Sequence, residues 1–202
     1  IVIIGAGACG VRAAFALREN GFSGPVTLIG DAPEMPYERP PLSKPNGQNP
    51  NPIRSAQAFD EAKITLMRGV AVTEIDPKNR QIHLDDQTKM AYDHLLIASG
   101  SRPRMVSAFE GCLTLRTAKD AAQILPKFTP KARIGIIGGG FIGLELAATA
   151  VSAGADVTVI EAAPRLLGRA GPTPIAMALQ TRHTQEGVRF LMGVGVTHAT
   201  AT

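Results

Sequence analysis

The sequence lacks tryptophan, has few aromatic residues and contains only two cysteines among its 202 residues. Cys9 and Cys112 lie far apart and form neither a CxxC motif nor a ligand pair, which indicates a reducing compartment without a disulfide framework or a redox-active disulfide. No run of about 18 apolar residues is present, and the apolar start at 1–4 has no basic leader. The sequence therefore predicts no signal peptide, no membrane span and a cytoplasmic location.

Several kinds of catalytic site are also missing from the sequence. The four histidines, at positions 83, 94, 183 and 198, have no partner at helical spacing and no acidic cluster beside them, so we expect no metal site. Neither GxSxG nor GxxxxGK[ST] occurs, which excludes the common hydrolase and P-loop interpretations. The net charge of +4 is compatible with a nucleic acid, an acidic protein or an anionic dinucleotide as partner.

What the sequence does contain is glycine, 21 residues of it, and a repeated pattern of strand, helix and strand. The apolar run at 1–4 predicts a buried parallel strand, a helix follows over 8–20, and 26–29 forms the next strand. The same order returns with a strand at 133–137, a helix ending near 153 and a strand at 157–160. The fold class that we predict is α/β with two Rossmann-like dinucleotide-binding segments.

The remaining elements are shorter. The proline-rich stretch at 33–52 excludes a long helix, and 101–111 is rich in turn residues. We expect short helices at 55–61, 118–125 and 173–186, and strands at 64–66, 70–75, 80–84, 89–91, 94–98 and 188–191, of which 94–98 reads as buried.

The first glycine motif has the context that a dinucleotide site requires. Gly5, Gly7 and Gly10 follow a strand and open a helix, where they allow the chain to turn, admit a pyrophosphate and pack the helix on the strand. Asp31 ends the next strand, where an acid holds the ribose hydroxyls of the adenosine. A glycine-rich turn without a ligand is the plainer alternative.

The second motif repeats this arrangement with Gly138, Gly140 and Gly143, followed by Glu161. A glutamate at that position accepts hydrogen bonds from a free ribose 2'-hydroxyl and repels a 2'-phosphate, which favours NADH over NADPH. Arg165 and Arg169 lie nearby; they either contact a phosphate or form a solvated basic surface.

Longer segments make the sequence similar to a known family, the ferredoxin reductases of bacterial aromatic-ring dioxygenase and cytochrome P450 systems. These segments are PYERPPLSK (36–44), YDHLLIASGSRPR (92–104), LRTAKDA (115–121), GIIGGGFIGLELAATA (135–150) and VTVIEAAPRLLGRA (157–170). The proline-rich segment is the most specific, and the others occur across the glutathione-reductase-like superfamily. The resemblance covers nearly the whole chain.

The resemblance implies an FAD site and an NADH site, residue by residue. FAD would be bound by Gly5, Gly7, Gly10, Asp31, Arg39, Lys44, the backbone of Val72, the turn from Ala98 to Gly100, and Arg116. NADH would be bound by Gly138, Gly140, Ile142, Gly143 and Glu161. It places Lys44 and Glu145 beside the flavin ring, where a cation stabilises the reduced flavin and the carboxylate orients that cation. Without the resemblance, a loop lysine and a helix-surface carboxylate are the simpler interpretations.

The resemblance also shows what to expect of the domains. Residues 1–108 would form an FAD domain that lacks its C-terminal return segment, and residues 109–202 an NADH domain. The chain begins inside a strand without a methionine and lacks the family's C-terminal domain, so we expect residues to be absent at both ends. The CxxxxC pair of the superfamily is missing too, which argues against disulfide substrates.

The function that follows is transfer of a hydride from NADH to FAD and then of single electrons to a ferredoxin that serves an oxygenase. Arg102 and Arg104 would contact an acidic ferredoxin, and we expect neither a nucleic acid nor a membrane as partner. One alternative is a reductase for rubredoxin or another small acceptor. Another is a dinucleotide-binding regulator similar to apoptosis-inducing factor, whose basic surface binds nucleic acid or protein.

Overall fold

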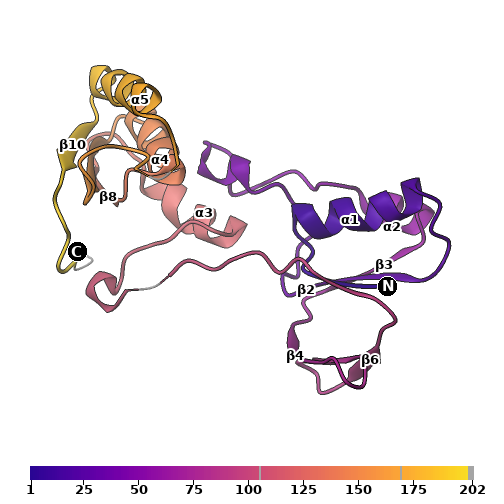
Figure 1. Cartoon of the computed structure of the whole chain (residues 1–202). Coiled ribbons are helices and arrows are strands. Elements are labelled where there is room, and N and C mark those ends of the chain that lie inside the picture. Colours follow the sequence, from indigo (N-terminus) through magenta and orange to yellow (C-terminus); the bar gives the residue numbers. More distant parts are fainter. Residues whose placement is uncertain (105, 169, 200–202) are drawn as a thin grey trace. The chain divides into compact units, whose positions relative to one another are not determined.

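The computed structural model describes residues 1–104, 106–168 and 170–199. The chain divides into two compact units, and each is described by itself (Figure 1). The first contains Ile1–Glu38 and Asn51–Ser101, and the second contains Arg39–Pro50 and Arg102–Thr202. Contacts therefore group 39–50 with the second unit, whereas the boundary expected from the sequence keeps this segment with residues 1–108. The assignment of one domain to FAD and the other to NADH stays a prediction.

A parallel four-stranded sheet forms the centre of the first unit, in the order β3-β2-β1-β7. Its strands are β1 (Val2–Ile4), β2 (Val26–Gly30), β3 (Ile64–Arg68) and β7 (Leu95–Ile97). Helix α1 (Ala8–Glu19) connects β1 to β2, and α2 (Ala56–Glu61) precedes β3. The hydroxyl of Ser55 caps α2 by accepting a hydrogen bond from the Ala58 N–H.

The two faces of this sheet are covered by different kinds of element. Helices α1 and α2 lie on one face, and the antiparallel strands β4 (Val72–Asp76), β5 (Gln81–Leu84) and β6 (Lys89–Ala91) lie on the other (Figure 1). Because side chains alternate along a strand, neighbours enter separate cores. The helix-side core contains Ile3, Val11, Ala14, Val26, Leu28, Phe59 and Ile64. The opposite core contains Val2, Ile29, Ile82 and Leu84.

The turns between β4, β5 and β6 contain aspartates whose side chains accept hydrogen bonds from nearby residues. The side chain of Asn79 donates to Asp76, and this hydrogen bond lowers the pKa of the Asp76 carboxyl. The Thr88 hydroxyl donates to Asp86 and lowers the pKa of that carboxyl in the same way. Both side chains accept backbone hydrogen bonds as well, which closes the turns locally.

The second unit contains a parallel sheet in the order β10-β9-β8. Its strands are β8 (Arg133–Ile137), β9 (Asp156–Glu161) and β10 (Arg189–Met192). Its helices are α3 (Ala118–Ile124), α4 (Phe141–Ser152) and α5 (Thr173–Gln185), with short 3-10 turns η1 (Pro40–Ser43), η2 (Ser107–Phe109) and η3 (Leu125–Lys127). Alanines at 147 and 150 let α4 pack closely on Val157 and Val159 of β9.

The predicted elements are confirmed within two residues at each end, and so is the fold class of two Rossmann-like α/β segments. The burial of 94–98 was predicted wrongly. Leu96 is 38% exposed and Ile97 is 60% exposed, because β7 is the end strand of its sheet in this chain. A run of apolar residues cannot tell a central strand from one whose outer side has no neighbour. No described helix is both long and apolar enough to cross a membrane.

Candidate dinucleotide site

In the first glycine loop, two of the three glycines are required by close contacts and the third is not. Gly5 has φ of +107°, and a Cβ there would lie 2.3 Å from the carbonyl oxygen of Ala98. A Cβ on Gly10 would lie 1.9 Å from the oxygen of Gly5, so only glycine lets α1 approach the end of β1. Gly7, the N-cap of α1, has no atom within 4 Å of its Cβ position. The loop therefore packs tightly at its two ends and is open at its middle glycine.

The second loop repeats this geometry. Gly138 has φ of +105°, and a Cβ on Gly143 would lie 2.2 Å from the oxygen of Gly138. Gly140 is the N-cap of α4 with φ of −83° and ψ of −179°, nearly the values of −83° and −172° found at Gly7. Its Cβ position is also open. The loop repeat seen in the sequence is thus a repeat of backbone conformation.

The start of each helix is arranged to receive an anion. Neither N-cap glycine can supply a side chain, and the first turns of α1 and α4, both fully described, contain no acidic residue. The first N–H groups of a helix have no partner within the helix, and the helix dipole adds partial positive charge there. Each of the two helices therefore begins at a glycine with free space beside it and with no side chain capping its N–H groups, which suits the binding of a pyrophosphate at each.

The two acids predicted to bind ribose lie at the ends of their strands but have different surroundings. Asp31 follows β2, is exposed, and accepts no hydrogen bond from the described residues. Glu161 ends β9, and its two carboxylate oxygens accept hydrogen bonds of 2.7 Å from the backbone N–H groups of Gly139 and Ala163. The glycine loop itself therefore fixes the direction of the Glu161 carboxylate.

Arg165 is hydrogen-bonded to the backbone of its own loop. Its guanidinium donates to the carbonyl oxygen of Gly171 at 2.8 Å and to that of Gly168 at 2.7 Å. It therefore closes the loop after β9. Arg169, the other arginine of the pair, lies outside the described residues.

Lys44 and Glu145 lie together in the second unit. The Lys44 ammonium is 3.4 Å from Oε1 of Glu145, and both side chains are about half exposed. The hydroxyl of Ser43 donates to the other carboxylate oxygen at 2.5 Å, and the Thr149 hydroxyl donates to the Ser43 carbonyl at 2.7 Å. Ser43 and Thr149 were missed from the sequence, although Ser43 lies inside PPLSK and Thr149 follows Glu145 by one helical turn.

The other residues of the predicted FAD site belong to both units. Val72 begins β4, and the Ala98 N–H donates to the carbonyl of Ile4 beside the first glycine loop. Gly100 has φ of +73°, a conformation that favours glycine. In the second unit, Arg39 is the N-cap of η1 and Arg116 precedes α3. Ile142, from the predicted NADH site, is 54% exposed in the first turn of α4.

The residues fit the two groups that the sequence implies. The Nε atom of Arg116 is buried and has no hydrogen-bond partner among the described residues, as expected of a donor reserved for a ligand. The open positions at Gly7 and Gly140 leave room above two uncapped helix starts. These observations agree with the demands of two anionic dinucleotides.

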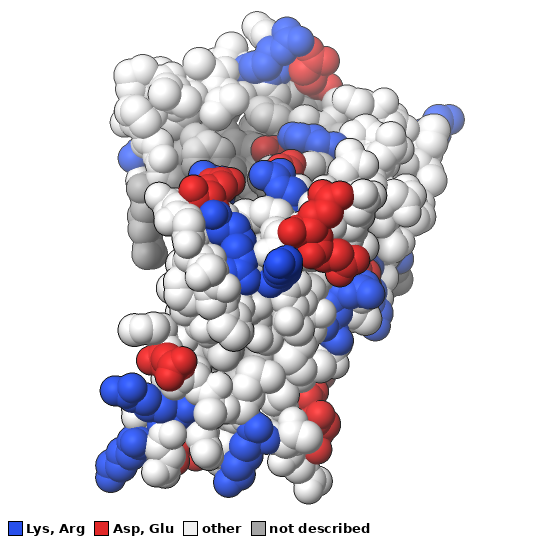
Figure 2. All heavy atoms as spheres, turned by 90° about the vertical axis from the view of Figure 1, so that its right-hand side faces the viewer, with Lys and Arg blue, Asp and Glu red and all other residues white. Residues whose placement is uncertain are grey.

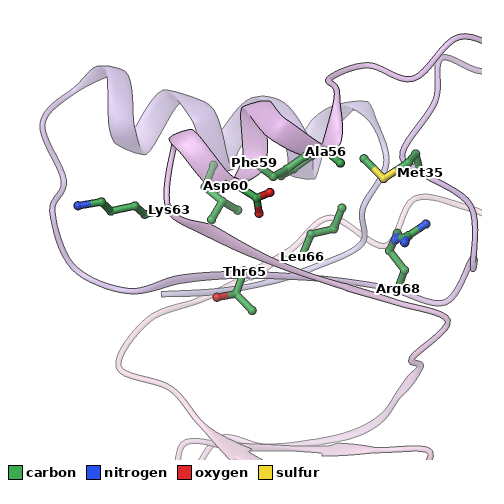
Figure 3. Close-up of a pocket in the computed structure, with 9 residues that line it drawn as sticks. Met35, Ala56, Phe59, Asp60, Lys63, Thr65, Leu66 and Arg68 are labelled. Carbon is green, nitrogen blue, oxygen red and sulfur yellow. The ribbon is translucent and has the colours of Figure 1, made fainter.

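An open cavity of about 600 Å³ lies elsewhere, between α2 and β3 of the first unit (Figure 3). Its lining includes Met35, Phe59 and Leu66, and its charged groups are Asp60, Lys63 and Arg68. None of the predicted site residues lines it.

Comparison with known proteins supports the same assignment. The family model described as pyridine nucleotide-disulphide oxidoreductase matches residues 1–202. Rhodocoxin reductase of Rhodococcus erythropolis is 42% identical over 206 residues, covering 97% of this chain and 48% of the relative. The ferredoxin--NAD(+) reductase component of the p-cumate 2,3-dioxygenase system of Pseudomonas putida is 41% identical, covering 98% and 51%.

A solved structure of the covalent putidaredoxin reductase–putidaredoxin complex is similar as well. It has a TM-score of 0.92 and 35% identity, covering 100% of this chain and 51% of that one. The chain spans about half the length of the curated relatives it matches. The resemblance to ferredoxin reductases stated from the sequence is thereby confirmed. With the family model matching the chain from end to end, this protein belongs to the pyridine nucleotide-disulphide oxidoreductase family.

Proposed function

We propose that the whole protein is an FAD-containing oxidoreductase that takes electrons from NADH and delivers them to a ferredoxin serving an oxygenase. The observation that carries this proposal is the pair of matching glycine loops, each with an uncapped helix start and a following acid. Two dinucleotide sites in one chain suit an enzyme that transfers electrons between two cofactors. The relatives named above are reductases that match this chain over almost its whole length.

In this proposal the first loop binds FAD and the second binds NADH. The FAD residues are Gly5, Gly7, Gly10, Asp31, Arg39, Lys44, Val72, Ala98, Gly100 and Arg116, and the NADH residues are Gly138, Gly140, Ile142, Gly143 and Glu161. When bound, FAD supplies the chemistry of accepting a hydride and releasing single electrons. The protein contributes position and charge.

Lys44 and Glu145 are the charged groups proposed to act at the flavin. Lys44 provides a positive charge that favours the anionic, reduced form of the ring over the neutral, oxidised form. Glu145 holds the ammonium group within 3.4 Å and limits its freedom. Since both side chains are half exposed, the pair contributes little to folding, and its value lies in orientation.

The proposed electron acceptor is an acidic ferredoxin. Arg102 and Arg104 are both exposed and offer positive charge for such a partner. The putidaredoxin reductase of the similar structure was solved in a complex with putidaredoxin. The two free cysteines, one of them exposed, support the finer proposal of a cytoplasmic location.

The charge pattern bears on the alternative of a nucleic-acid-binding regulator. Figure 2 shows lysine and arginine side chains lying among aspartate and glutamate side chains on the face turned to the viewer. A nucleic-acid surface instead gathers basic residues along one face or helix. This observation favours the reductase.

The test uses the full-length flavoprotein, mixed anaerobically with NADH and separately with NADPH while flavin absorbance is followed. Rapid bleaching by NADH and slow bleaching by NADPH are expected. If flavin stays bound and neither nucleotide bleaches it, the reductase proposal is wrong and the regulator takes its place.

A further inference from the structure

Ser43 stands apart among the polar residues of this chain. It is 2% exposed and is the one buried polar side chain among the described residues. Burial of a hydroxyl away from water is unfavourable unless the hydroxyl has a hydrogen-bond partner. The hydrogen-bond acceptor of the Ser43 hydroxyl therefore explains why this side chain can be buried.

The Ser43 hydroxyl has two acceptors within range but only one proton. Oε2 of Glu145 lies at 2.5 Å and the carbonyl oxygen of Pro40 at 3.4 Å. The proton goes to Glu145, because that acceptor is nearer and carries negative charge. The carboxylate of Glu145 is then held on both sides, by the hydroxyl at one oxygen and by the Lys44 ammonium at the other.

A second hydrogen bond holds the backbone of Ser43. The Thr149 hydroxyl, one turn along α4 from Glu145, donates to the Ser43 carbonyl at 2.7 Å. The turn η1 is thus attached to α4 at two points, once through the side chain of Ser43 and once through its backbone. All four residues belong to the second unit, so the arrangement is complete within it.

These contacts fix the backbone position from which the Lys44 side chain extends. Lys44 is the C-cap of η1, with φ of −89° and ψ of 165°, and its N–H donates to the Pro41 carbonyl. A half-exposed lysine on a free loop would sample many rotamers. Attachment of the preceding residue to α4 brings Lys44 to the carboxylate with its backbone already fixed.

We infer that Ser43 and Thr149 are positioning residues that fix the Lys44–Glu145 pair by attaching η1 to α4. The inference rests on the proposed function, in which this pair acts at the flavin. It adds that the direction of the Glu145 carboxylate is set by the Ser43 hydroxyl and that the Thr149 hydroxyl sets the backbone from which Lys44 extends. Neither residue needs to touch a cofactor.

Matched variants of the full-length flavoprotein separate hydroxyl chemistry from packing. Thr149→Val keeps the shape and removes the hydroxyl, whereas Thr149→Ser keeps the hydroxyl and removes a methyl group. Ser43→Ala removes the second hydroxyl. Ser152→Ala makes the same change on the same helix, at an exposed hydroxyl without a hydrogen bond among the described residues, and is the control. The measurements are the rate of anaerobic bleaching by NADH and the midpoint potential of the bound flavin.

Thr149→Val and Ser43→Ala should bleach about tenfold more slowly and shift the midpoint potential to more negative values, because a loosened Lys44 favours the reduced ring less. Thr149→Ser and Ser152→Ala should match the wild type. In a double-mutant cycle, Ser43→Ala should add little to Glu145→Ala, since each change removes the hydrogen bond between these two side chains.

The inference is overturned if Thr149→Val keeps the wild-type rate and potential, or if the losses from Ser43→Ala and Glu145→Ala simply multiply. Failure of the proposed function has a different signature, because the wild-type flavoprotein itself would then not be bleached by NADH. Amide hydrogen exchange at Lys44 and Gly47 distinguishes these cases. It should accelerate in Ser43→Ala and Thr149→Val whether or not the flavin is reduced.

Discussion

At the scale of single residues, the last glycine of each loop is fixed by the chain's own packing and the middle one is not. Gly10 and Gly143 have no room for a Cβ, since the nearest carbonyl oxygens lie at 1.9 Å and 2.2 Å from that position. Gly7 and Gly140 have nothing within 4 Å. The first pair is required by the fold, and we propose that the second pair is glycine because a pyrophosphate binds there.

This difference predicts opposite results for two alanine substitutions. Gly7→Ala should change the free energy of unfolding of the apoprotein by less than about 0.5 kcal/mol, because its φ of −83° suits any residue. It should still reduce bound flavin, since the new methyl group fills the space of the pyrophosphate. Gly10→Ala should cost about 3 kcal/mol or more through backbone displacement. Urea unfolding and flavin content measure both effects, and loss of flavin without loss of stability in Gly10→Ala would contradict this account.

Glu161 provides a residue-scale test of nucleotide choice. Glu161→Gln removes the negative charge that would repel a 2'-phosphate but keeps an acceptor for one of the two backbone N–H groups. The ratio of kcat/KM for NADH to that for NADPH should fall about tenfold. Asp156→Asn, an exposed acid at the other end of β9, should leave the ratio unchanged. An unchanged ratio in Glu161→Gln would show that another residue distinguishes the ribose 2'-hydroxyl from a 2'-phosphate.

At the scale of elements, Arg18 joins α1 to the turn before β3. Its guanidinium donates to the carbonyl oxygens of Phe22, Gly24, Ala62 and Lys63 at distances from 2.6 to 2.8 Å. Arg18→Met keeps the apolar stem but leaves four carbonyls without this donor, and we expect a loss of about 2–3 kcal/mol in the free energy of unfolding. Arg12→Met, which removes one exposed ion pair with Glu19, should cost less than about 0.5 kcal/mol. Equal losses in thermal unfolding would refute the role given to Arg18.

The elements were the most predictable part of this protein, because their signals are local. The glycine loops and the helices and strands beside them involve residues a few positions apart, and they were found where the sequence placed them. Partners distant in sequence were not predictable. The Ser43–Glu145 hydrogen bond joins residues 102 positions apart, and the sequence gives no signal that 39–50 packs with the second unit. The exposure of Ile97 likewise depends on which strand lies beside β7, which no local pattern determines.

At the scale of the whole molecule, the proposed reductase has two reactions that respond to different features. Reduction by NADH depends on the glycine loops and the Lys44–Glu145 pair. Delivery of electrons to a separate ferredoxin depends on the surface charge that the partner meets, and surface charge acts through long-range attraction that salt weakens. Changes at exposed arginines should therefore affect the second reaction and spare the first.

The double charge reversal Arg102→Glu with Arg104→Glu tests this separation. Ferredoxin reduction at low ionic strength should fall about tenfold and should lose most of its salt dependence, because like charges now oppose the encounter. Bleaching by NADH and flavin content should not change. The matched control is Lys78→Glu with Lys89→Glu, two exposed residues in the β4–β5 turn and in β6, which alters the net charge by the same amount. If both double variants slow ferredoxin reduction equally, net charge governs the encounter and the two arginines have no special place in it.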